Sequence, residues 1–114
     1  MDGRININVS AVDYDRTSAA LSRRLSHLEA MTHGQDEFAM TDSEFAFGWH
    51  FFVLSVSRGM VERLAEMLGG EFDALKGKGM EKKFLTWLEK NTGEGPRFKL
   101  ALKDEMESSK FGIF

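Results

Sequence analysis

The sequence predicts a mainly α fold, in which three to four helices follow an N-terminal arm that is extended or forms a short strand. Two segments carry apolar residues at helical spacing, and residues typical of helix ends flank the longest predicted helix. The chain of 114 residues has the usual size of one domain and contains no internal repeat. We therefore expect residues 1–114 to form a single small helical domain, and we expect it to be dimeric.

The composition limits the class of protein before any motif is considered. The chain is 42% hydrophobic and 29% charged, which is typical of a globular protein rather than a disordered chain or a membrane span. It contains no cysteine, so disulfides, thiolate metal sites and a cysteine nucleophile are excluded. No long apolar run of a signal peptide follows the first residues, and we expect a cytoplasmic location.

Residues 1–12 are predicted to form the N-terminal arm. Apolar Ile5, Ile7 and Val9 alternate with polar Asn6 and Asn8, which is a short-strand pattern. An extended arm that leads into a helix explains the same alternation equally well.

Residues 13–31 are predicted to form the first helix. One narrow stripe recurs at steps of four, three, four and three residues, and it comprises Tyr14, Ser18, Leu21, Leu25 and Leu28. Asp13 or Asp15 is suited to cap the start of this helix. So narrow a seam favours packing against one neighbouring helix, either of the same chain or of a second copy. Leu21, Leu25 and Leu28 are therefore candidate residues for a dimer contact or for close helix packing.

Residues 42–68 are predicted to form a long central helix. The segment from Thr41 to Glu44 matches a capping box, and Gly69 and Gly70 are suited to end the helix. With about 100° per residue, one sector of this helix is apolar along its whole length. We expect that sector to be core, and its members are Phe45, Trp49, Val53, Val56, Met60, Leu64 and Met67.

A second face of the same predicted helix carries Phe47, Phe51 and Leu54, with the polar Arg58 at its end. Burying the three apolar side chains would contribute on the order of 5–8 kcal/mol, so we expect something to cover them. Another helix of the same chain is one candidate, and an exposed patch for dimerisation or for binding a partner is the other. We take Phe47, Phe51, Leu54 and Arg58 as candidate partner-binding residues.

Small residues mark a third direction of the predicted central helix. Gly48, Ser55 and Gly59 follow one another at steps of seven and four residues, which would let another backbone approach closely. They are candidates for a dimer contact or for close helix packing. The apolar run from Phe45 to Val56 is too short to cross a bilayer, and His50 interrupts it.

Two further segments complete the predicted fold. Residues 80–91 form a helix whose apolar positions are Met80, Phe84, Trp87 and Leu88. Over residues 97–103, apolar and polar residues alternate as in a strand. Pro96 and the helix formers that follow favour a helix over residues 96–109, which is the prediction we make, with the strand as the alternative.

No motif in the sequence predicts catalysis, a cofactor or a metal. His33, Asp36 and Glu37 include metal-ligating residue types, but a solvated loop explains them better. His50 stands among aromatic residues with no matching nucleophile nearby, which favours a hydrogen-bonded interior or interface histidine over a general base. We expect a protein that is not an enzyme.

Three segments of the chain resemble the QslA family of quorum-sensing antiactivators. They are Arg4–Val9, Asp13–Thr17 and Phe45–Phe52, and the resemblance extends over the full chain. It implies a small non-enzymatic homodimer that binds the ligand-binding domain of a LuxR-type transcription activator. By occupying the surface through which the activator dimerises, such a protein would keep the activator from DNA. No contact residue is carried over from this family.

The chemistry and the resemblance agree on a regulator that acts by protein–protein interaction, without a catalytic group. One alternative is a helical dimer that encloses a small apolar ligand between its subunits, with His50 orienting the ligand. Another is a small DNA-binding regulator. The chain has 15 basic and 18 acidic residues, a net charge of −3, which argues against direct binding to nucleic acid.

Overall fold

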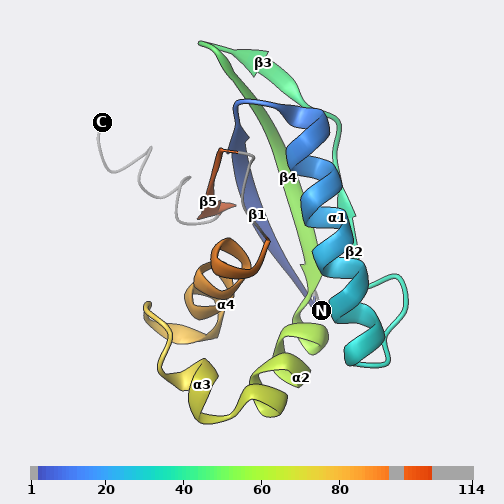
Figure 1. The fold of residues 1–114 in the computed structure, drawn as a ribbon, viewed down its shortest axis with the longest axis vertical. Helices are drawn as coiled ribbons and strands as arrows, with labels where there is room; N and C mark the ends of the chain where they lie inside the picture. The colour runs from blue at the N-terminus through green and yellow to red at the C-terminus, as the bar shows by residue number, and fades with distance from the viewer. Residues whose placement is uncertain (1–2, 93–96, 104–114) are drawn as a thin grey trace.

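A computed structural model describes residues 3–92 and 97–103 and shows that the mainly α prediction is wrong. The described residues form a five-stranded antiparallel sheet together with four helices (Figure 1). In chain order the elements are β1 Arg4–Ala11, α1 Tyr14–Met31, β2 Phe38–Met40, β3 Glu44–Ala46, β4 Trp49–Ser57, α2 Arg58–Leu68, α3 Gly70–Asp73, α4 Gly79–Asn91 and β5 Phe98–Leu102.

The sheet has the strand order β2-β4-β1-β5, and β3 pairs with β4 beyond the end of β2. All the pairs are antiparallel. Helix α1 connects β1 to β2, and helices α2 to α4 connect β4 to β5. This order of elements, with β1 and β2 on either side of β4, is the split β-α-β arrangement of ferredoxin-like folds. It positions β1 and β4 at the centre of the sheet.

One face of the sheet is buried and the other is open. Along β1, residues Ile5, Ile7 and Val9 are at most 3% exposed, whereas the intervening Asn6 is exposed. The buried side chains of β1 and β4 join those of α1, α2 and α4 in a single apolar cluster. The helices therefore cover one face of the sheet, called here the inner face. No helix of residues 3–92 lies over the opposite, outer face.

The predicted helix over residues 42–68 is wrong for its first 16 residues. Residues 44–46 form β3, residues 49–57 form β4, and only Arg58–Leu68 is helical. The segment Trp49–Ser57 is rich in aromatic and β-branched residues, which favour a pleated strand. Steps of two then decide which side chains are buried, and they are Phe52, Leu54 and Val56.

The capping residues of this region also differ from the prediction. Ser57 caps α2, because its Oγ accepts a hydrogen bond from the backbone N–H of Met60 at 3.2 Å. Thr41 Oγ1 instead accepts a hydrogen bond from the backbone N–H of Val53 at 2.9 Å, across the strands. The stripe of small residues is wrong as well. Gly48 lies in a turn, Ser55 in β4 and Gly59 in α2, so the three share no helix face.

The first predicted helix is present as α1, Tyr14–Met31. Asp13 caps it by accepting a hydrogen bond from the backbone N–H of Arg16 at 3.0 Å. Leu21, Leu25 and Leu28 are at most 1% exposed in the core of the same chain. Their seam is therefore filled internally and is not available to a second copy.

The remaining predictions divide between helix and strand. The arm predicted over residues 1–12 forms β1, at the centre of the sheet, and the helix predicted over 80–91 is present as α4. The helix predicted over 96–109 is wrong over Phe98–Leu102, which forms β5 and pairs with β1, as in the strand alternative. Residue 96 and residues 104–109 lie outside the described residues. No helix within the described ranges is long and apolar enough to cross a membrane.

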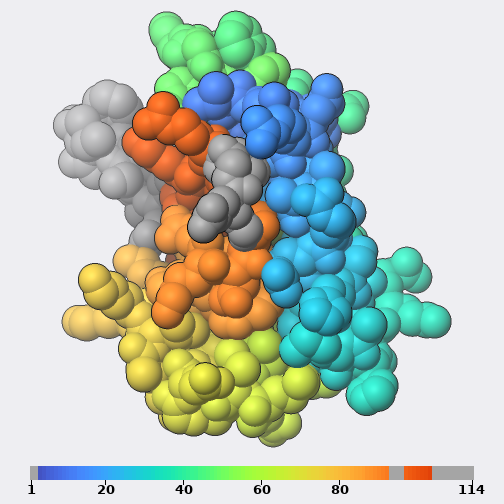
Figure 2. Space-filling model, viewed as in Figure 1, coloured from blue at the N-terminus to red at the C-terminus, as the bar shows by residue number. Residues whose placement is uncertain are grey.

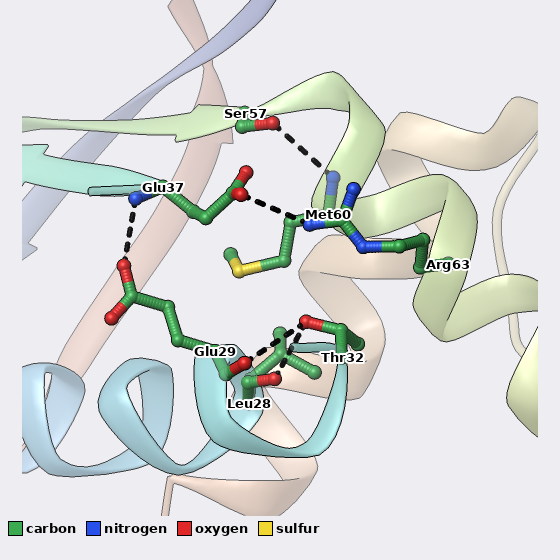
Figure 3. Close-up of polar contacts among 7 residues, drawn as sticks. All are labelled: Leu28, Glu29, Thr32, Glu37, Ser57, Met60 and Arg63. Atoms are coloured by element: carbon green, nitrogen blue, oxygen red, sulfur yellow. Dashed lines mark hydrogen bonds and ion pairs between the residues drawn. The ribbon is translucent and has the colours of Figure 1, made fainter. Parts of the chain in front are cut away.

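The loop after α1 is fixed to both neighbouring helices by Glu37 (Figure 3). The backbone N–H of Glu37 donates to Glu29 Oε2 at 2.7 Å, and its Oε2 lies 3.0 Å from Nη2 of Arg63 in α2. A hydrogen bond from the Ser57 side chain, and then the charge of Arg63, lower the pKa of Glu37 below its ordinary value of 4.5. The carboxylate form of Glu37 is thus the form that stabilises this corner of the fold.

Replacing Glu37 with glutamine is expected to lower the free energy of unfolding at pH 7 and to weaken its dependence on acid pH. A lowered folded-state pKa gives stability that is present above the unfolded pKa and is lost as the pH falls through the folded pKa. The difference between wild type and E37Q should therefore be largest near neutrality and shrink below about pH 4.5. Urea unfolding at neutral and acid pH measures it. A difference that stays constant with pH would contradict the role given to the Glu37 charge.

Candidate functional site

The most exposed aromatic side chain of the described residues lies at the tip of the β3–β4 hairpin. Ala46 pairs with Trp49, so the hairpin loop consists of only Phe47 and Gly48. Both have positive φ, 54° and 82° respectively, as in a type I′ turn. The hairpin extends past the ends of β1 and α1 in Figure 1, and it forms the green cap at the top of the surface in Figure 2.

The backbone conformation at Phe47 is unfavourable for phenylalanine. Type I′ turns favour Asn or Asp followed by Gly, because a bulky L-residue at positive φ is strained by about 1–2 kcal/mol. Phe47 is 97% exposed, so its ring contributes almost no apolar burial that would offset this strain. A strained backbone combined with an exposed aromatic ring points to a role outside this chain.

The base of the hairpin is packed on α1 through aromatic rings. The Phe45 ring, 65% exposed, lies 4.7 Å from the ring of His50, and Tyr14 of α1 lies 6.3 Å beyond His50. Tyr14 also meets Phe52 edge to face at 5.0 Å, and its hydroxyl donates to the carbonyl of Thr41 at 3.3 Å. His50 is thus part of a cluster of tilted aromatic rings at the base of the hairpin.

The outer face of the sheet continues the aromatic surface from the hairpin. Phe51 is 38% exposed and stands directly opposite Glu44 of β3 on one side and Ser10 of β1 on the other. Side chains paired in this way point to the same face of the sheet. A groove of about 460 Å³ runs beside Phe51, and Asp42, Glu44, Asn8 and Ser10 contribute to its walls.

The structure separates the four residues that we predicted to bind a partner. Phe47 and Phe51 lie on the hairpin and the outer face, where they are exposed. Leu54 is 0% exposed in the core, so its assignment to a binding surface is wrong. Arg58 begins α2 at the opposite end of β4, roughly 20 Å along the strand from Phe51, and pairs with Glu81 at 2.8 Å. The cause is the period of two in a strand, which places Phe51 and Leu54 on opposite faces.

Several residues of this surface lie elsewhere than their sequence pattern predicts. Phe45, Trp49 and Val53 were expected in the core, but Phe45 is largely exposed and the other two are only partly buried. Asp42 and Glu44 were assigned to a helix start and instead line the groove. The only local signal for this hairpin is Gly48, a residue that suits a tight turn, at the start of a segment rich in aromatic and β-branched residues.

The loop residues considered as metal ligands do not form a metal site in the described structure. His33 and Asp36 have positive φ in the turn after α1, and Glu37 pairs with Arg63. Within residues 3–92 and 97–103, no three His, Asp or Glu side chains gather closely enough to hold a metal ion. Within the described residues, we therefore take the aromatic hairpin and the groove beside it as the candidate functional site.

Comparison of the chain with protein-family models, with curated proteins and with solved structures finds no significant match.

Proposed function

We propose that this protein is a non-enzymatic regulator that acts by protein–protein interaction, as a cytoplasmic homodimer. Its partner in this proposal is the ligand-binding domain of a LuxR-type transcription activator. Binding blocks dimerisation of the activator, which then no longer binds DNA. The observation that carries the proposal is Phe47, a 97% exposed aromatic ring on a backbone with φ of 54° at the tip of a hairpin.

Two considerations support a protein partner at this hairpin. Aromatic side chains supply much of the binding energy at protein interfaces, and a projecting hairpin presents them to a surface groove. The segment Phe45–Phe52, which contributes to the resemblance to quorum-sensing antiactivators, is also the segment that forms the hairpin tip and the first half of β4. The resemblance and the exposed aromatic surface therefore fall on the same residues.

The proposal is tested by mixing the protein with the ligand-binding domain of each LuxR-type activator of the same organism. Light scattering after size exclusion should show the activator dimer replaced by a complex that contains one activator domain per binding site. A gel shift with the full activator should show loss of the activator–DNA band as the protein is added. Activators that all remain dimeric and DNA-bound in the presence of excess protein would contradict the proposed function.

A further inference from the structure

We infer that the groove beside the hairpin binds a basic side chain, arginine or lysine, of the partner protein. The inference rests on the proposed function, because it gives the chemistry of the contact next to the aromatic tip. Its basis is the row formed by Glu44, Phe51 and Ser10 across three neighbouring strands, together with Asp42 at the edge of the same groove.

The strand register fixes the aromatic part of this site. Glu44 and Phe51 are directly opposite each other on β3 and β4, so their side chains leave the same face about 5 Å apart. Phe51 and Glu44 therefore both line the groove from the same face of the sheet. Ser10 lies on the other side of the ring, with an uncharged hydroxyl.

The residue before the second carboxylate is fixed to the sheet. Thr41 is tied to Val53 twice, by its backbone N–H donating to the Val53 carbonyl at 3.0 Å and by its Oγ1 accepting from the Val53 N–H at 2.9 Å. Asp42 follows immediately and is exposed at the groove. Among the residues that the structure describes, neither Asp42 nor Glu44 takes part in an ion pair.

An arginine or lysine side chain matches both parts of this groove. Its methylene stem packs on an apolar ring while its charged end reaches the carboxylates, with which guanidinium and ammonium groups form strong hydrogen bonds. An acidic side chain of the partner would be repelled by Asp42 and Glu44. An apolar side chain would displace water from these two carboxylates without supplying a positive charge. On the same face, Lys99 of β5 stands opposite Ser10 and places its Nζ 5.5 Å from the ring centre of Trp49, a cation–π contact that shows a basic side chain on an aromatic ring of this face.

The test uses N-acetyl-arginine amide as the probe and N-acetyl-citrulline amide, its uncharged isostere, as the control ligand. In ¹H–¹⁵N spectra, arginine amide at millimolar concentration should shift the amide signals of Ser10, Glu44 and Phe51, and citrulline amide should not. Added salt should weaken the arginine effect, since exposed charges are screened. Equal shifts with both ligands, or no shift with arginine amide at tens of millimolar, would overturn the inference.

Variants of Asp42 and Glu44 test whether arginine amide binds at these two carboxylates. The double variant D42N/E44Q should weaken arginine amide binding by at least about fivefold, as expected for two exposed charge contacts. The matched control is E62Q/E66Q, which removes the same charge from exposed acids of α2 and should leave binding unchanged. Unchanged binding in D42N/E44Q would also overturn the inference. The probe needs no activator, so this result and the activator experiment fail independently of each other.

Discussion

Replacing Leu54 with alanine is expected to destabilise the protein by about 2–5 kcal/mol, the usual effect of truncating a fully buried leucine. Leu54 is 0% exposed at the centre of β4 and pairs with Ile7 of β1, which is itself fully buried. Truncation leaves a cavity between the sheet and the helices, and the surrounding strands relax only in part. Urea unfolding followed by circular dichroism measures the change in the free energy of unfolding.

The neighbouring residue provides the matched control. Val53 lies on the outer face and is partly exposed, so V53A should destabilise the protein by less than about 1 kcal/mol. A continuous helix over residues 42–68 would reverse this order, because Val53 would then lie in the core stripe and Leu54 on the second face. A larger effect of V53A than of L54A would therefore contradict the strand assignment of β4.

The helices that could be predicted from the sequence are those whose apolar spacing fits a helix and does not fit a strand. Residues 13–31 carry a narrow stripe with a capping aspartate before it, and residues 80–91 carry four apolar positions at helical spacing. Local pattern and tertiary packing agree there, so α1 and α4 lie where they were predicted. The alternation over residues 4–9 likewise corresponds to β1.

The central segment could not be assigned from its apolar spacing alone. Between Trp49 and Val56 almost every residue is apolar, so steps of two and steps of three or four are both filled. Partners distant in the sequence decide the outcome, since β4 pairs with β1 on one side and with β2 and β3 on the other. Strand β5 depends in the same way on pairing with β1. The sequence pattern of a single segment does not predict such pairing with distant strands.

The candidate site could be predicted only in part for the same reason. Phe47 and Phe51 were selected because they lay off the apolar stripe of a helix, and they are exposed as members of a hairpin and a strand instead. Leu54 shares a face with Phe51 in a helix, but residues three apart lie on opposite faces of a strand. Asp42 and Glu44 are distant from Ser10 in the sequence, and only the strand register brings them to one groove.

Replacing Phe47 with asparagine is expected to change stability and partner binding in opposite directions. Asparagine tolerates positive φ and is favoured at this position of a type I′ turn, so F47N should stabilise the hairpin by about 0.5–1 kcal/mol. The melting temperature should rise by about 2–4 °C. The ring that is lost makes almost no contact within the chain, since it is 97% exposed, and the fold should stay intact.

Binding should fall in the same variant because the central aromatic contact is removed. Truncation of an aromatic residue at the centre of an interface typically weakens binding by at least about 2 kcal/mol, or roughly 30-fold. A control is provided by M67N, which removes an apolar side chain that is 52% exposed on α2, far along the chain from the hairpin. M67N should bind the activator domain proposed as the partner as tightly as the wild type does.

The most direct test of the proposed docking hairpin is calorimetric titration of the wild-type protein and the F47N variant into the activator domain proposed as the partner. The melting curve of each sample is recorded beside the titration. We predict a melting temperature at or above that of the wild type together with an affinity at least about 30-fold weaker. An F47N variant that melts well below the wild type, or that binds the activator with unchanged affinity, would show that Phe47 serves the fold or is dispensable, and would contradict this account.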